Sequence, residues 1–188
     1  MSSINAPFGL RPSFHPSGLD RAVALPNGIT SAYGSNILKG QPVALNTSGA
    51  IIIATAGSAY QGAFAGVEFT DTTGRRRVSN YWPSGTTGTD IVAYYYSDPN
   101  IVYDIQADGS LAQTSIGDQA NFTNTTAGST TTGLSACTIS TSLAGSSAVG
   151  DMRIIGLYPG VDNAWGDAYT VVQVQISRSQ YVATINAI

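Results

Sequence analysis

The sequence predicts an all-β fold, a compact β-barrel or β-sandwich of the jelly-roll type that carries an extended N-terminal arm. Two observations lead to this prediction. Short runs of β-branched and aromatic residues alternate with turn residues along most of the 188-residue chain, a pattern typical of sandwiches and barrels. Helical signals are nearly absent, since the chain contains one glutamate and one lysine, two residue types that helices favour.

Residues 1–36 form the predicted arm. Four prolines and four glycines are spaced through this segment. Because proline fixes φ and removes a backbone donor, neither a long helix nor a central strand is expected here. Apolar side chains such as Phe8, Leu10 and Phe14 lie between these residues and need a surface to cover them. Two alternatives remain open: the arm packs on its own domain, or it reaches a neighbouring subunit.

Residues 37–188 form the predicted β domain. Turn residues separate short apolar runs in this part of the chain, and residues near 111–150 are a polar insertion rich in serine and threonine. In the last run, valine alternates with glutamine, which predicts one buried and one solvated face. The expected strands are 39–45, 50–55, 63–69, 90–96, 101–106, 119–122, 134–140, 152–158 and 169–176.

The charge content is low and excludes several classes of partner. Only 10% of the residues are charged and the net charge is −3, so the basic face with which proteins bind nucleic acid is not expected. No apolar run approaches the roughly 20 residues that span a membrane, and the N-terminus lacks the pattern of a secretory signal. Serine, threonine and glycine supply about a third of the chain, which favours a surface covered by other protein subunits.

Residues that could carry catalysis are few, so the sequence indicates a protein that is not an enzyme and uses no cofactor or metal. His15 is the only histidine and lies in the irregular arm, which is a poor scaffold for a catalytic triad. Cys137 is the only cysteine and is expected to be a small core residue. A calcium site that uses Asp162 and Asp167 with loop carbonyls remains an alternative.

Arg75, Arg76 and Arg77 form the one run of charges. Three interpretations are open: an edge strand that charge protects from pairing, ion pairs with acidic groups of a neighbouring protein, or contact with nucleic acid. Successive residues of a strand point to opposite faces, so the three side chains cannot all meet one phosphate backbone.

Several stretches resemble structural proteins of tailed bacteriophages. Residues 5–12 (Asn-Ala-Pro-Phe-Gly-Leu-Arg-Pro) are similar to the start of many such proteins, and residues 39–45 and 62–67 resemble their first barrel strands. Residues 98–109 resemble a central hairpin of the same proteins. Together these stretches resemble the family of head decoration, or cement, proteins.

The resemblance implies a function and a set of partners. Decoration proteins bind the outside of a capsid and strengthen it, and they have a β-barrel or sandwich with an arm, no enzymatic activity and an oligomer at a symmetry axis. For this chain it implies the major capsid protein and further copies of itself as partners, as a homotrimer or alternatively a dimer. It implies synthesis in the host cytoplasm and a final place on the virion exterior. The implied contact residues are Pro7, Phe8, Leu10, Arg11, Phe14, Arg75, Arg76 and Arg77.

Two other functions remain alternatives. One is a different phage structural part, such as a tail-tube or fibre component. The other is a carbohydrate-binding β-sandwich, in which Tyr81, Trp82, Tyr94, Tyr95 and Tyr96 would stack on sugar rings. For the decoration protein, deletion of residues 2–16 is expected to leave the β domain folded and to abolish capsid binding.

Overall fold

The computed structural model describes residues 2–18, 21–145 and 147–182. The fold is nearly all β, with about 42% of residues in strands and 2% in helix, so the predicted fold class is confirmed. The helical part is a single 3-10 turn, Gln113–Ser115. Within the described ranges, no helix is long and apolar enough to cross a bilayer.

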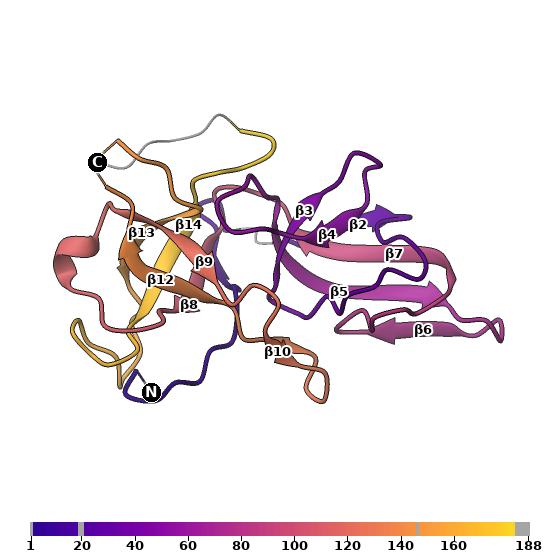
Figure 1. Ribbon diagram of the computed structural model, residues 1–188, viewed down its shortest axis with the longest axis horizontal. Coiled ribbons are helices and arrows are strands. Elements are labelled where there is room, and N and C mark those ends of the chain that lie inside the picture. Colours follow the sequence, from indigo (N-terminus) through magenta and orange to yellow (C-terminus); the bar gives the residue numbers. More distant parts are fainter. Residues whose placement is uncertain (1, 19–20, 146, 183–188) are drawn as a thin grey trace.

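Two antiparallel sheets form two lobes that lie side by side along the long axis (Figure 1). The first sheet contains six strands and is strongly curled, because its edge strand β12 returns to the end of β8, where Ile139 forms an isolated bridge with Ala107. The other edge strand, β1, lies on the far side of β8. We call this curled sheet the barrel sheet. Its spatial order is β1 (Arg11–Phe14), β8 (Val102–Gln106), β14 (Val171–Ile176), β13 (Met152–Leu157), β9 (Gln119–Thr123) and β12 (Thr138–Leu143).

The second sheet is built around the long pair β5 and β7, and we call it the β5–β7 sheet. One edge of β5 pairs with β3 near its start and with β6 near its end. A small hairpin, β10 (Gly128–Ser129) with β11 (Leu134–Ser135), projects beside it. The spatial order is β2 (Val23–Pro26), β7 (Thr89–Tyr96), β5 (Gly62–Thr70), β3 (Pro42–Leu45) and β4 (Ile51–Ile53), with β6 (Arg76–Ser79).

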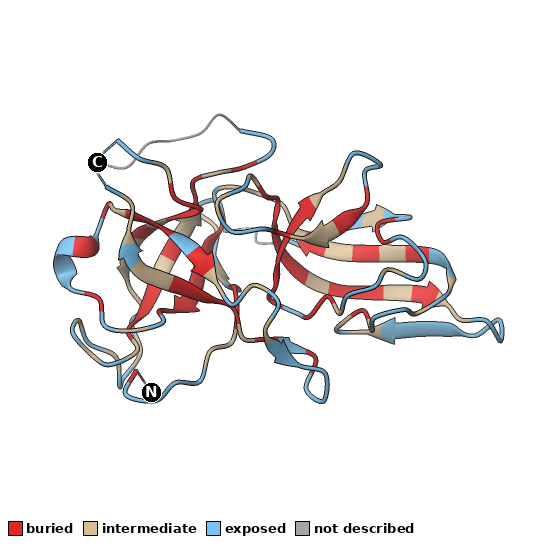
Figure 2. Ribbon diagram, in the orientation of Figure 1, coloured by how far each residue is buried: buried red, intermediate tan, exposed pale blue. Residues whose placement is uncertain are grey.

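Each lobe has its own apolar core, visible as buried segments along the central strands (Figure 2). The core of the β5–β7 lobe includes Phe64, Trp82 and Tyr95. The barrel core is built mainly from β8, β9, β12, β13 and β14, but Tyr60 and Ala63 from the other lobe are also part of it. Burial of these residues in the barrel core therefore holds the two lobes together.

The N-terminal segment packs on its own chain. Its two strands, β1 and β2, lie at the edges of the two sheets, the places where Pro12 and Pro26 are tolerated. Leu10 is buried in the barrel core, and the Gln106 side chain accepts from the Ala6 N–H and donates to the Ile4 carbonyl. Of the two alternatives for the arm, the described residues therefore show packing on the same chain.

Three details differ from the pattern that the sequence predicts. The expected strand 134–140 is split into β11 and β12, because Cys137 N–H bonds the Ser135 hydroxyl at 3.1 Å instead of a neighbouring strand. Residues 111–150 include β9 and β12, so much of this polar stretch belongs to the barrel sheet. All five residues of β8 are buried, since the N-terminal segment covers its polar side chains.

One detail of the predicted pattern is confirmed. The valine–glutamine alternation expected for β14 is present, because Gln173 and Gln175 are more exposed than the residues on either side of them.

Candidate functional site

The residues that could carry catalysis do not form a cluster. Among the described residues, no group of three or more His, Cys, Asp or Glu side chains could hold a metal ion. Cys137 is buried as predicted, and burial raises the pKa of its thiol, so the thiol stays protonated at neutral pH. His15 Nε2 lies 3.1 Å from the Asp98 carboxylate, and its Nδ1 accepts the Ser17 N–H at 3.0 Å. These contacts tie a surface turn to the β7–β8 turn.

The position considered for calcium is filled by the chain itself. Ser2 is buried between the two acidic residues, where its N–H donates to the Asp162 carbonyl and its hydroxyl donates to the Asp167 carboxylate. The hydroxyl and the Ala164 N–H lower the pKa of Asp167. The pair therefore anchors the N-terminal segment to the 158–170 loop.

The aromatic residues considered for sugar stacking are largely committed to the fold. Trp82 is fully buried and meets the Phe69 ring edge to face, with 5.2 Å between ring centroids. Tyr95 is also buried, and the Tyr94 hydroxyl donates to Glu68 at 2.9 Å. Trp82 thus has no free ring face for a sugar.

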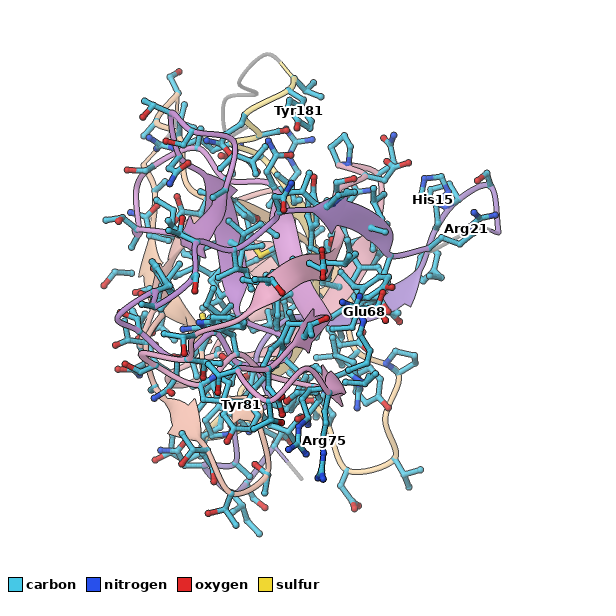
Figure 3. All side chains as sticks on the ribbon, turned by 90° about the vertical axis from the view of Figure 1, so that its right-hand side faces the viewer. His15, Arg21, Glu68, Arg75, Tyr81 and Tyr181 are labelled. Carbon is cyan, nitrogen blue, oxygen red and sulfur yellow. The ribbon has the colours of Figure 1, made fainter. Side chains whose placement is uncertain are left out.

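The arginine run lies on the exposed edge strand β6 and in the turn before it. Arg76 pairs with Glu68 at 3.0 Å, and Arg77 pairs with Asp71 at 2.7 Å. Arg75 is exposed, and no acidic partner of its side chain is found in the described part of the chain. Figure 3 shows Glu68 and Arg75 on the lobe that carries this edge. Two of the three arginines therefore form ion pairs with acidic residues of the same chain.

Arg11 is the centre of a second group of predicted contact residues. Its guanidinium lies 4.7 Å from the Phe8 ring centroid and 5.2 Å from that of Tyr158, distances that favour cation–π attraction. One nitrogen bonds the nearly buried Asp104 carboxylate at 3.1 Å, while half of the Arg11 side chain remains exposed. We call Phe8, Arg11 and Tyr158 the Arg11 cluster.

Two hollows flank the Arg11 cluster, because Phe8 and Arg11 line both of them. The first, of about 360 Å³, lies against the 158–163 loop and is called the loop hollow. The second, of about 330 Å³, lies where the two lobes meet and is called the waist hollow. The waist hollow is lined by Phe8, Leu10, Arg11, Pro12, Lys39, Gly40, Phe64, Tyr96 and Leu134.

The remaining predicted contact residues divide between core and surface. Leu10 is almost fully buried and cannot reach a partner as an apolar anchor. Pro7 is half-buried, whereas Phe14 at the end of β1 is 46% exposed. Arg11 and Phe14 are thus the exposed members of the predicted arm contact, and Phe8 is half-buried like Pro7.

Sequence reasoning missed the partners of these residues. Tyr158, Tyr96, Lys39 and Leu134 come from four separate segments, and none of them belongs to a motif with the N-terminal residues. The only local signals were the apolar Phe8 and the charged Arg11. The hollows arise from tertiary packing of distant segments, which no pattern along the chain encodes.

Comparison of the chain with protein-family models, with curated proteins and with solved structures finds no match.

Proposed function

We propose that this chain is a structural protein of a bacteriophage virion that binds the outer surface of the capsid and stabilises it. The observation that carries the proposal is the Arg11 cluster, in which an exposed arginine lies between two half-buried rings with a hollow on either side. Arginine and aromatic residues dominate the energetics of protein interfaces, and this group forms a preorganised patch of that kind. The partner proposed for it is the major capsid protein.

The composition supports the same conclusion. A chain with 10% charged residues has little charge to keep it apart from other protein, and the resemblance of its N-terminal and strand segments to decoration proteins points in the same direction. Assembly as a homotrimer, with a dimer as the alternative, would place several Arg11 clusters on one lattice and raise avidity without new contacts. Virion exterior is the proposed location, after synthesis in the host cytoplasm.

The packing of the N-terminal segment changes how this proposal is tested. Deletion of residues 2–16 would remove Leu10 from the barrel core and Ser2 from its buried bonds. We therefore expect the deletion to impair folding, so that loss of binding would be uninformative. Single substitutions at exposed positions separate binding from folding.

The experiment measures co-sedimentation of the purified chain with capsid shells assembled from the major capsid protein of the same genome. We expect Arg11→Ala and Phe14→Ala each to weaken binding by about tenfold, the usual effect of truncating an interface anchor. Val78→Ala, at an 81% exposed site on the β6 edge, is the matched control and should bind as the unmodified protein does. Thermal melting of every variant checks the fold.

Two outcomes would contradict the proposal. Absence of binding to the shells by the unmodified chain would reject it, and so would equal binding by all three variants. Electron microscopy of virions separates the main alternative, since a tail-tube or fibre component would lie on the tail and a decoration protein lies in an icosahedral lattice on the head.

A further inference from the structure

The waist hollow carries charge of one sign only. Its lining includes two cations and no carboxylate: Lys39, and Arg11, whose guanidinium already pairs with Asp104 outside the lining. The loop hollow, in contrast, is lined by one cation, Arg11, and one acidic residue, Asp162. Its charges therefore favour neither an anionic nor a cationic partner.

Lys39 is the only lysine of the chain, and it is exposed at the rim of the waist hollow. Its backbone is held on both sides, since its N–H donates to the Gly133 carbonyl and its carbonyl accepts the Ser135 N–H. No acidic partner for its ammonium is found in the described part of the chain. Two hydrogen bonds therefore fix the backbone of Lys39 at the rim, and its exposed ammonium is available to attract an anion.

The walls of the waist hollow are apolar. Phe64 forms part of them from the core of the β5–β7 lobe, and Leu10 from the barrel core. Leu134 is 43% exposed at the hollow. A volume of about 330 Å³ lies at the lower end of the range of roughly 300–1,000 Å³ for ligand pockets, which suits one or two apolar side chains.

The adjacent strand edge does not offer a regular ladder to a partner. The outer edge of β1 is unpaired within the described residues, but Pro12 at its centre has no N–H to donate. An additional strand would therefore find an interrupted row of hydrogen bonds. Recognition at this place depends on side chains that enter the hollow.

The geometry points to the waist hollow as the binding site for a segment of the capsid protein in which an apolar side chain stands next to a carboxylate. The apolar side chain enters between Phe64 and Leu134, and the carboxylate meets the Lys39 ammonium and the exposed part of the Arg11 guanidinium. This assignment rests on the proposed function for the identity of the partner, and it adds the chemistry that the partner must present.

The test uses a capped pentapeptide with leucine at the odd positions and aspartate at the even positions. A second peptide carries lysine in place of aspartate. Binding is measured by NMR titration of the ¹⁵N-labelled full chain, which also locates the site from the shifted amides. We expect the aspartate peptide to bind more tightly than the lysine peptide and to shift the amides of residues 39, 40 and 134.

Two charge reversals provide a matched comparison. Lys39→Glu is expected to weaken binding of the aspartate peptide roughly fivefold, since an exposed pair worth up to about 1 kcal/mol turns into a repulsion. Arg75→Glu makes the same change of net charge at an exposed residue that does not line the waist hollow, so it should leave the affinity for the aspartate peptide unchanged. Leu134→Ser should weaken binding of both peptides, because it removes apolar surface.

The inference is overturned if both peptides bind equally, if Arg75→Glu has the effect of Lys39→Glu, or if the shifted amides lie elsewhere. It is also overturned if a short oligothymidylate displaces the aspartate peptide at the same concentration, because the site would then recognise phosphate. Shell binding that Lys39→Glu leaves unchanged would reject the inference and retain the proposed function. If the chain binds the aspartate peptide at the waist hollow but does not bind the shells, the proposed function is rejected and the chemistry inferred for the hollow is retained.

Discussion

At the scale of single residues, glycines determine how closely the N-terminal segment approaches the rest of the molecule. Gly9 has a φ of +73°, and a Cβ added to it would lie 2.5 Å from the Gly40 carbonyl oxygen. The next residue, Leu10, donates its N–H to that same oxygen at 2.7 Å. Only glycine permits both the backbone conformation and the close contact. Gly9 therefore fixes how the neighbouring residues Phe8, Leu10 and Arg11 lie against the Gly40 turn.

Gly9→Ala is therefore expected to destabilise the protein by about 2–4 kcal/mol, through strain at positive φ together with a steric clash. Gly49→Ala is the matched control, since Gly49 has a φ of +75° but no heavy atom within 4 Å of an added Cβ. The control should lose only about 1 kcal/mol. Urea unfolding measures both free energies, and equal losses for the two variants would show that contact with Gly40 is unimportant.

At the scale of elements, the hairpin of β5 and β6 shows why arginines occur together on an edge strand. The Thr73 hydroxyl, the Arg75 N–H and the Arg77 guanidinium all bond Asp71 and hold its pKa well below the ordinary value of 3.8. The Tyr94 hydroxyl, and after it Arg76, lowers the pKa of Glu68. The bonds that lower these two pKa values stabilise the folded state only while the carboxylates are ionised. This stabilisation is complete at a pH above the pKa of an unperturbed carboxyl group, and it is lost as the pH falls below that value.

We expect the β6 amides to lose hydrogen-exchange protection below about pH 4, before the amides of β14 do. NMR titration of the Asp71 carboxyl should give a midpoint below that of an unperturbed aspartate. Arg77→Ala should raise this midpoint, because it removes the guanidinium from the four donors that bond Asp71, the others being the Thr73 hydroxyl and the N–H groups of Thr73 and Arg75. Arg75→Ala leaves the backbone N–H of residue 75 in place and should have little effect. A midpoint that is ordinary in the unmodified protein would contradict this account.

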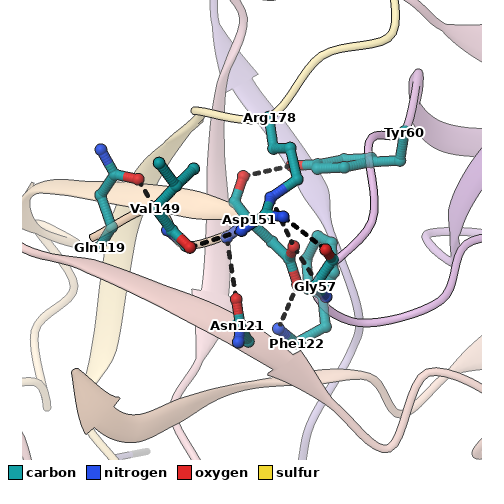
Figure 4. Close-up of polar contacts among 9 residues, drawn as sticks. Gly57, Tyr60, Gln119, Asn121, Phe122, Val149, Asp151 and Arg178 are labelled. Atoms are coloured by element: carbon teal, nitrogen blue, oxygen red, sulfur yellow. Dashed lines mark hydrogen bonds and ion pairs between the residues drawn. The ribbon is translucent and has the colours of Figure 1, made fainter. Parts of the chain in front are cut away.

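At the scale of the whole molecule, a buried polar cluster connects the two lobes (Figure 4). The Asp151 carboxylate accepts the N–H of Gly57, from the loop after β4, and the N–H of Phe122 in β9, each at 3.0 Å. Arg178, after β14, donates to the carbonyls of Gly57 and Val149. Burial raises the pKa of Asp151, while the two N–H donors and Arg178 counteract this rise.

Asp151→Asn is expected to destabilise the protein by about 2–4 kcal/mol, because an amide NH₂ would face a buried N–H donor with no acceptor between them. Asp118→Asn is the control, at a half-buried aspartate with no such cluster of donors. Thermal and urea unfolding measure the difference. If both substitutions had the same small effect, the cluster would contribute little to the connection between the lobes.

Much of the fold follows from local chemistry along the chain. Valine and isoleucine runs bounded by Asn, Asp and Gly turns predicted the main strands, and the valine–glutamine alternation of β14 predicted its buried face. Proline predicted that the N-terminal segment could not enter a sheet centre, and Pro12 and Pro26 do lie in edge strands. Cys137 was correctly expected in the core. These features depend on neighbours in sequence, which is why a pattern can reveal them.

Other features depend on which distant segments meet. The sequence left open whether Leu10 covers its own core or a neighbouring subunit, and packing against β8 and the 39–40 turn resolves this for the described chain. The sequence made Trp82 a candidate for sugar stacking, but in the structure this side chain is buried and packs against Phe69. The waist hollow, which Phe8, Lys39 and Leu134 help to line, has no signature along the chain, because its shape and its charge arise only when two lobes with separate cores are brought together.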